Sequence, residues 1–363
     1  MAKSSLKSNV YSQLSSFKKE IRFFKQNSWF FAGSKLDLSN LNDYKTISVL
    51  NTPIVIYLTK KNEYKAFVNV CPHRGSLIKL KERGNGPLVC KYHFWSYDEE
   101  GKIKNIPLKK DLFTNKEAKE IFENSKLKQW NLEFCGNFIF ISHSDNKSSL
   151  KNYLGSEYKK IELISNSIQK RESIQVWEWD ANWKICVENS LDEYHAKFAH
   201  PSTFNKLIKL QPKYKKSNNV YSMNMPISDE AKKKWSKFNK YFSKRIINNN
   251  DYNHYHIFPM NSISSSYGVN FFVQTYMPIN PFRTRVISEL YIAKNISSKL
   301  SKNVTDGIKK AFLNFNNTVF DEDKILCESV HKGIISQELK HPIVSNYEKR
   351  ISFFTNKLKR IYK

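Results

Sequence analysis

The chain has 363 residues, of which 40% are apolar and 14% aromatic, and this is enough for the cores of two ordinary domains. No segment approaches the ~20 consecutive apolar residues of a membrane-spanning helix, and the first residues lack the apolar block of a secretory signal, so we expect a soluble cytoplasmic protein and no membrane partner. The net charge of +27 is spread over the whole chain without a nucleic-acid-binding pattern, which argues against a nucleic-acid partner.

The first part of the chain favours a helix followed by a β domain. Residues 1–27 are basic, with Glu20 as their one acid, and predict an amphipathic helical segment; a transit peptide is the alternative. Residues 28–150 contain short β-rich runs separated by polar and Gly-containing turns, which predict a compact antiparallel β domain. The runs are ISVL, IVIYLT, YKAFVNV, PLVCKYHFW and GNFIFIS.

The second part of the chain, residues 151–363, mixes strand and helix patterns. A polar Ser- and Lys-rich stretch at 144–160 is predicted to be a linker ahead of it, and the charged stretch 229–251 to be a solvated helix or mobile cover. The fold class that we predict is α+β, with an antiparallel sheet flanked by helices in this second domain. The expected strands are 173–180, 262–279 and 284–294, and a long helix is expected over 302–334.

Two pairs of potential metal ligands lie in the β domain. Cys71 and His73 are separated by one residue, Cys90 and His93 by two, and sixteen residues lie between the pairs. Each pair follows a β-run, so two turns could present one Cys and one His each to a shared point. A structural Cys2His2 zinc site and a Rieske [2Fe–2S] cluster both use such ligands. The alternation of Cys and His within each pair favours the cluster.

A second group of ligands occurs in the α+β domain. On a helix, Glu188, Asp192 and His195 would share one face, beside an apolar stripe of Val187, Leu191, Tyr194 and Phe198. His200 lies about 140° further round an ideal helix than His195, so both can bind one metal only if the helix ends or bulges between them. Pro201 is consistent with such a break.

The two motifs together resemble those of Rieske non-haem iron oxygenases, in the terminal oxygenase (alpha) subunit of the aromatic ring-hydroxylating dioxygenase family. The resemblance implies that Cys71, His73, Cys90 and His93 hold the [2Fe–2S] cluster. It also implies that His195 and His200 bind a mononuclear iron, and that Asp192 is the catalytic carboxylate bridging this iron site to a Rieske His. Phe94 departs from the family, which commonly has Gly after the second His.

The third iron ligand is expected in the long helix, where apolar residues recur at steps of three and four. Asp323 interrupts this stripe, and the segment TVFDEDKILCE resembles the family segment that supplies the carboxylate ligand. Asp321 and Glu322 are the alternatives if the stripe is drawn one residue off. The predicted stripe consists of Ile308, Phe312, Phe315, Val319, Asp323, Leu326, Val330 and Ile334.

The resemblance further implies a helix-grip (START-like) catalytic domain, a homotrimer and O2 as cosubstrate. Electrons would come from NAD(P)H through a separate reductase and possibly a ferredoxin, because the chain has no fingerprint for a flavin or a nicotinamide. The substrate would be a small organic molecule, and Asp192 rather than Glu leans toward an aromatic one. Quaternary-ammonium or methylamine substrates such as choline, carnitine or betaine stay open, as do a non-catalytic Rieske electron-transfer protein and a zinc-stabilised binding module.

The remaining Cys and His residues carry less information. His254 and His256 alternate as on a strand and could line a substrate cavity, although a partly exposed strand explains them equally well. Cys135, Cys186 and Cys327 are predicted to be buried structural thiols.

Overall fold

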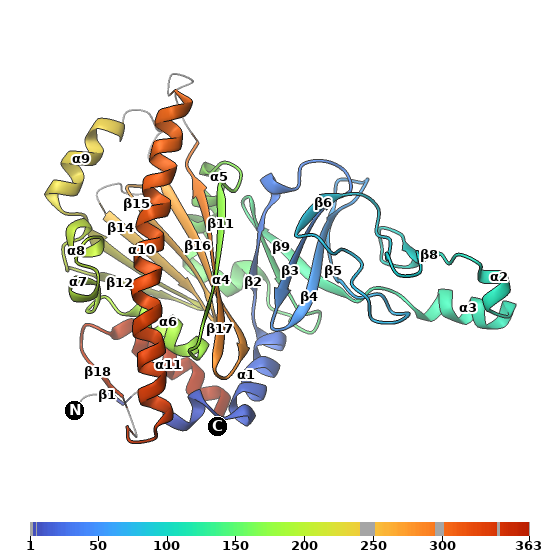
Figure 1. The fold of residues 1–363 in the computed structure, drawn as a ribbon, viewed down its shortest axis with the longest axis horizontal. Coiled ribbons are helices and arrows are strands. Elements are labelled where there is room, and N and C mark those ends of the chain that lie inside the picture. The colour runs from blue at the N-terminus through green and yellow to red at the C-terminus, as the bar shows by residue number, and fades with distance from the viewer. Residues whose placement is uncertain (1–2, 5, 240–250, 295–300, 340–341, 363) are drawn as a thin grey trace. The chain divides into compact units, whose positions relative to one another are not determined.

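The computed structural model describes residues 3–4, 6–239, 251–294, 301–339 and 342–362. Two compact units make up the chain: residues 25–150 form one, and residues 1–24 with 151–363 form the other. Figure 1 shows their secondary structure. Within the described residues, no helix has the length and the apolar composition that crossing a lipid bilayer requires.

The unit of residues 25–150 is built on a seven-stranded antiparallel sheet in the order β2-β10-β9-β5-β4-β3-β6. β-branched and aromatic side chains dominate its inner strands, and those of β4 are almost all buried. The predicted β-run at 87–95 is instead a turn with an isolated bridge at Val89, because its backbone hydrogen bonds close a loop. The elements are β2 (Phe30–Ser34), β3 (Asp43–Val49), β4 (Thr52–Leu58), β5 (Tyr64–Val68), β6 (Arg83–Asn85), β7 (Ser96–Tyr97), β8 (Ile103–Asn105), α2 (Lys109–Leu112), α3 (Asn115–Asn124), β9 (Gln129–Cys135) and β10 (Phe138–Ser142).

The other unit contains a second seven-stranded antiparallel sheet, in the order β11-β17-β16-β15-β14-β13-β12. The expected strands lie in this sheet, and the predicted α+β fold class is confirmed. The strands are β11 (Ser173–Trp179), β12 (Lys213–Ser217), β13 (Val220–Pro226), β14 (Asp251–Ile257), β15 (Asn261–Ser266), β16 (Asn270–Asn280) and β17 (Arg283–Ile292), and a short pair is formed by β1 (Lys3–Ser4) and β18 (Ile343–Val344).

Helices accompany this second sheet, and the long α10 runs along its face (Figure 1). The side chain of Ser301 caps α10 by accepting a hydrogen bond from the Val304 amide. The helices are α1 (Leu14–Asn27), α4 (Leu150–Leu154), α5 (Tyr158–Ser167), α6 (Trp183–Leu191), α7 (Ala196–Ala199), α8 (Phe204–Leu207), α9 (Asp229–Asn239), α10 (Lys302–Ile335) and α11 (Lys349–Tyr362), with short 3-10 turns at η1 (Ser8–Tyr11) and η3 (Gly155–Glu157). A further 3-10 turn, η2 (Lys35–Asp37), belongs to the unit of residues 25–150.

The predicted stripe on α10 is correct only in part. Val319, Asp323 and Ile334 are buried, but Leu326 and Val330 are 37% and 49% exposed. Their predicted places on the buried face are taken by the neighbouring residues Cys327 and His331. The reason is a tertiary contact, because His331 Nδ1 accepts a hydrogen bond from the amide of Asn182, at the start of α6.

Two connecting segments also differ from the prediction. The expected linker 144–160 contains α4, whose Leu150 and Leu154 are fully buried, so this stretch is folded rather than a free connection. In the charged stretch 229–251, residues 229–239 form α9, as the helical alternative predicts, while 240–250 lie outside the described residues.

Candidate metal centres and the cavity beside one of them

The two Cys–His pairs lie on two turns of matching geometry. In the first turn, the Cys71 amide donates to the Ser76 carbonyl and the Gly75 amide to the Cys71 carbonyl, at 2.8 and 2.9 Å. In the second, the Cys90 amide donates to the Trp95 carbonyl and the Phe94 amide to the Cys90 carbonyl, at 2.9 and 3.0 Å. The two turns therefore share one backbone geometry, in which the His stands two residues after the Cys in the first turn and three residues after it in the second.

The four predicted ligands come together at these turns. Cys71 and Cys90 are buried, at 2% and 1% exposure, and their thiols form a hydrogen bond with each other. The imidazole rings of His73 and His93 lie 4.6 Å apart, on the outer side of the thiols, where His73 is exposed. This arrangement of inner sulfur and outer imidazole suits a cluster with one iron held by two Cys and the other by two His.

Neighbouring side chains hold the four ligands in place. The Tyr97 hydroxyl lies 3.0 Å from Cys71 Sγ, and the ring of Trp95 stacks on His73 at 4.6 Å. Burial raises the pKa of the Cys71 thiol, so a bound metal is required to keep that sulfur as thiolate. Burial, together with the nearby His93 and Arg74, lowers the pKa of His73, which keeps its imidazole neutral and able to bind a metal.

Phe94 adopts the backbone conformation that Gly75 adopts in the other turn, with φ of 58° against 74°. A left-handed conformation costs a residue with a Cβ roughly 1–2 kcal/mol, and Phe94 is 58% exposed, so its side chain contributes little packing. We predict that Phe94→Gly raises the free energy of unfolding by about 1 kcal/mol, measured as loss of cluster absorbance in denaturant. Phe94→Ala is the control, because it removes the ring but keeps the strain. Equal stability of the two variants would contradict this account.

The second motif does not lie on one helix, contrary to our prediction. α6 ends at Leu191, because Asp192 Oδ1 accepts hydrogen bonds from the backbone amides of Tyr194 and His195, at 2.7 and 3.4 Å, in place of continuing the helix. The chain then turns before α7, and His200 ends that helix. The predicted interruption is thus present, but it begins before His195 rather than after it.

Because the helix ends at Leu191, the predicted apolar stripe beside the motif is correct only in its first half. Val187 and Leu191 are buried as expected, but Tyr194 and Phe198 are 51% and 66% exposed. Glu188 lies away from the motif's other acids, and its carboxylate accepts a hydrogen bond from the Tyr11 hydroxyl at 2.7 Å.

His195, His200 and Asp323 converge on one point. His195 Nε2 and His200 Nε2 lie 3.2 Å apart, and Asp323 Oδ1 lies 3.4 and 3.1 Å from these two nitrogens. Three ligands on one face of a metal, at bonds of about 2.1 Å, lie roughly 3 Å from one another. The donor set and its spacing therefore fit a 2-His-1-carboxylate iron site. Among the described residues, these are the ones whose ligand atoms cluster in this way.

The outward nitrogens of both His face carboxylates. His195 Nδ1 lies 3.2 Å from Asp192 Oδ2, and His200 Nδ1 lies 2.6 Å from Glu322 Oε2. Such partners fix the tautomer, so that each Nε2 is left to bind the metal. Glu322 was an alternative ligand on sequence grounds, but in the structure its carboxylate contacts the far side of the His200 ring.

The site concentrates negative charge in a buried place. Although burial disfavours the imidazolium form, Asp192 and Asp323 raise the pKa of His195 to about 10. Burial also opposes the ionised form of Asp323, but hydrogen bonds from the two His lower its pKa to about 2. The carboxylates therefore favour positive charge at the point where the three ligands meet, and a divalent cation supplies it.

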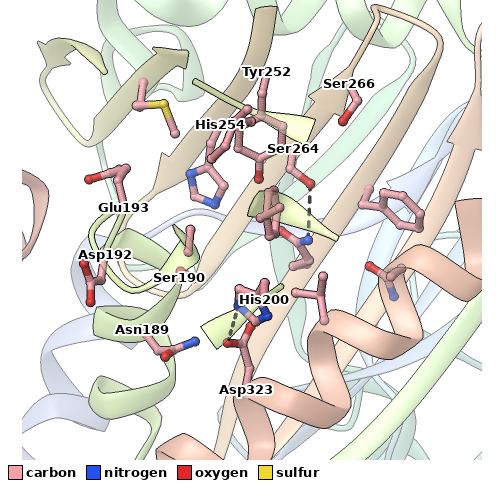
Figure 2. A pocket seen from close by; sticks show the side chains of 18 of the residues that line it. Asn189, Ser190, Asp192, Glu193, His200, Tyr252, His254, Ser264, Ser266 and Asp323 are labelled. Atoms are coloured by element: carbon pink, nitrogen blue, oxygen red, sulfur yellow. Dashed lines mark hydrogen bonds and ion pairs between the residues drawn. The ribbon is translucent and has the colours of Figure 1, made fainter. Parts of the chain in front are cut away.

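A cavity of about 90 Å³ lies beside the three ligands. In Figure 2, Tyr252, His254, Ser264 and Ser266 lie across it from His200 and Asp323. His254 thus lines a cavity, which is one of the two interpretations that the sequence allowed, and it is not part of an exposed strand face. His256 is buried and hydrogen-bonds Ser262.

One buried ion pair at this cavity has no signal in the sequence. Arg350 of α11 pairs with the carboxylate of Glu193, and its Nη1 donates to His254 Nδ1 at 2.6 Å. Arg350 Nη2 also donates to the Ser190 carbonyl at 3.4 Å, and Tyr214 donates to Glu193 at 3.1 Å. These contacts hold the turn after α6. Glu193 looks like any solvated acid in the sequence, and its partner lies 157 residues further along the chain, so local patterns could not reveal the pair.

Models of two protein families match the chain. Residues 28–120 match the Rieske [2Fe-2S] domain, and residues 153–363 match the ring hydroxylating alpha subunit (catalytic domain). The first match favours a [2Fe–2S] cluster over a structural zinc site in this domain. Together the two domains imply a [2Fe–2S] cluster and a mononuclear iron as cofactors.

Individual relatives agree with these family matches. The anthranilate 1,2-dioxygenase large subunit of Burkholderia cepacia is 30% identical over 198 residues, which are 51% of this chain and 45% of that protein, so the match spans about half of each. The carnitine monooxygenase oxygenase subunit of Acinetobacter pittii is 25% identical over 332 residues, 90% of this chain and 83% of that protein.

Solved structures show the same fold. A quaternary ammonium Rieske monooxygenase in complex with L-carnitine has a TM-score of 0.81 at 20% identity, covering 100% of this chain and 96% of that one. Naphthalene 1,2-dioxygenase from Rhodococcus sp. has a TM-score of 0.78 at 16% identity, with coverage of 98% and 94%. From its catalytic-domain match over 153–363 and its Rieske domain, this chain belongs to the family of ring-hydroxylating alpha subunits.

Proposed function

We propose that this protein is the terminal oxygenase component of a Rieske oxygenase system, which uses O2 to hydroxylate or demethylate a small organic substrate. The observation that carries the proposal is the convergence of His195, His200 and Asp323 to within 3.1–3.4 Å beside a cavity. A non-catalytic electron-transfer protein would need no such site. An Fe(II) held by three ligands on one face keeps open positions, at which O2 can be activated beside the substrate.

Each residue of the site then has a task in this proposal. His195, His200 and Asp323 hold the metal, and Asp192 and Glu322 keep the Nδ1 protons of the two His pointing away from it. The Arg350–Glu193 pair fixes the turn that carries His195. The cavity walls bind the substrate and exclude bulk water. Cys71, His73, Cys90 and His93 hold the cluster that supplies electrons.

We further propose that the domains 28–150 and 151–363 complete each other between subunits of a homotrimer. His73 is exposed at the tip of one domain, next to the exposed rings of Tyr92 and Phe94. In the other domain, Asp192 lies beside the exposed Tyr194 and Phe198. Burial of these apolar side chains would favour association, and a Rieske His of one subunit could then donate a hydrogen bond to Asp192 of the next.

The substrate class has two candidates. The aromatic class is named in the anthranilate and naphthalene dioxygenases that resemble this chain. The quaternary-ammonium class is named in the carnitine monooxygenase, which matches the longer stretch of sequence. NAD(P)H, a separate reductase and possibly a ferredoxin would supply the electrons in either case.

Turnover with labelled oxygen tests the proposal. The protein is purified without air, supplied with a surrogate reductase and NADH, and incubated under ¹⁸O2 with aromatic, methoxyaromatic and methylated-amine compounds. We expect ¹⁸O in a hydroxylated product, or the release of formaldehyde that depends on O2 from a demethylated one, and the reduced protein should give the low-average-g paramagnetic signal of a Rieske centre. Stoichiometric zinc without iron and sulfide would refute both centres. The paramagnetic signal without any product would leave only the electron-transfer function.

A further inference from the structure

One wall of the cavity beside the metal ligands is made of uncharged polar side chains. Ser264 and Ser266 of β15 lie on the same face of the sheet as Gln274 of β16, because the register pairs Ser264 with Phe272 and Ser262 with Gln274. All of them are at least nine-tenths buried. Figure 2 shows Ser264 and Ser266 on the side of the cavity away from Asp323.

Gln274 presents a hydrogen-bonding atom without a partner at this wall. Its Nε2 donates to Ser264 Oγ at 3.3 Å, and the Ser264 hydroxyl also hydrogen-bonds the phenol of Tyr252. This chain of contacts holds the amide in place. Gln274 is 7% exposed, and its Oε1 has no hydrogen-bond partner among the described residues. A buried acceptor without a partner is costly, so a donor from a bound molecule is the expected complement.

The charges around the cavity select against an anion at this wall. Among the described lining residues, Arg350 is the one Lys or Arg side chain. Both of its terminal nitrogens are engaged, Nη1 with His254 and Nη2 with Glu193 and the Ser190 carbonyl. A carboxylate placed against Gln274, on the wall away from the metal ligands, would meet amides and hydroxyls but no available side-chain cation, and a buried charge without a partner is strongly disfavoured.

We propose that the wall formed by Ser264, Ser266 and Gln274 recognises an uncharged amide or hydroxyl group of the substrate, whose N–H or O–H donates to Gln274 Oε1. Substrates that place a carboxylate there are rejected. This inference rests on the proposed function only in taking the cavity as the substrate site.

Matched pairs of small probes test the inference on the native protein. Benzamide and benzoate have nearly the same shape and differ in charge, and so do acetanilide and phenylacetate to a close approximation. Binding to the iron-loaded protein is measured by anaerobic calorimetry, without reductase or O2. We expect each amide to bind at least about tenfold more tightly than its carboxylate counterpart, since the carboxylate leaves Gln274 Oε1 without a donor.

Variants locate the effect at the wall. Gln274→Met removes the amide at similar volume, and we expect it to weaken benzamide binding about tenfold. Thr275→Val is the matched control, because Thr275 lies on the same strand with its side chain on the opposite face, hydrogen-bonded to Asn261, and benzamide affinity should not change. Iron content and the thermal unfolding midpoint show whether each variant is folded.

Two results would overturn the inference: neutral probes that bind no better than their carboxylate partners, or a folded Gln274→Met protein with unchanged benzamide affinity. Neither result bears on oxygenation, which the ¹⁸O2 experiment tests separately. Conversely, a protein that binds benzamide through Gln274 but forms no oxygenated product would retain this inference and lose the proposed function.

Discussion

Asp323→Ala is expected to abolish the mononuclear iron site while leaving the Rieske cluster intact. Asp323 Oδ1 is the carboxylate ligand atom at 3.1 and 3.4 Å from the two His nitrogens, and two neutral imidazoles alone hold Fe(II) weakly. Changes to residues that only support ligands already cost 10–100-fold in metal affinity or activity, so loss of a ligand should cost more than about 100-fold. Iron and sulfide analysis, the paramagnetic signal of the cluster and product formation measure the three effects.

Neighbouring acids on α10 provide the controls. Asp321 is exposed, one residue before the Glu322 that contacts His200, and Asp321→Ala should retain iron and activity. The iron content and activity of Glu322→Gln should lie between those of Asp323→Ala and Asp321→Ala, because this change weakens the contact to His200 Nδ1 without removing a ligand. Full iron content and full activity in Asp323→Ala would show that Asp323 is not the third ligand.

Asp192→Asn is expected to lower turnover by about 100-fold in protein whose iron site has been loaded and whose cluster is reduced normally by its donor. The Asp192 carboxylate has two contacts, since Oδ1 caps the turn after α6 and Oδ2 lies 3.2 Å from His195 Nδ1. Asn can still accept the backbone hydrogen bonds. Its NH2 group cannot accept a hydrogen bond from His195 Nδ1, nor from a Rieske His of a neighbouring subunit.

A single turnover isolates this effect. Pre-reduced protein is mixed with substrate and O2, and oxidation of the cluster is followed by its absorbance. We expect slow oxidation in Asp192→Asn and partial recovery in Asp192→Glu, which keeps the charge and the acceptor atoms. If cluster oxidation in the Asn variant is as fast as in the parent protein, Asp192 has only the local role of capping the turn.

Local patterns in the sequence were sufficient to select the candidate metal ligands. The spacing of Cys71, His73, Cys90 and His93 predicted the cluster ligands, because a turn that follows a strand places residues two or three apart on one tip. The long helix and about half of the strands were predictable for a similar reason, since their periods of 3.6 and 2 residues are local properties. Asp323 could be selected because it is an acid within an apolar stripe.

Only the tertiary structure decided the features that depend on distant partners. The buried side of α10 runs through Cys327 and His331 because His331 bonds the start of α6, and a pattern with steps of three and four cannot resolve a shift of one residue. The helix ends before Asp192 because a side chain competes with the backbone there, and helix propensity does not determine the outcome of that competition.

The substrate wall depended most on tertiary structure. β15 has the polar sequence NSISSS, most of which lies in the expected strand 262–279, but this composition does not predict that all six residues are buried between β14 and β16. Gln274 and Ser264 come from two strands, Arg350 from α11 and Glu193 from the turn after α6, and none follows a sequence motif. The sequence by itself was enough to select the candidate metal ligands, because ligand chemistry is encoded in residue type and local spacing. The fold decided what the cavity beside them can bind, because the charge and hydrogen-bonding capacity of a buried side chain depend on partners that only long-range packing supplies.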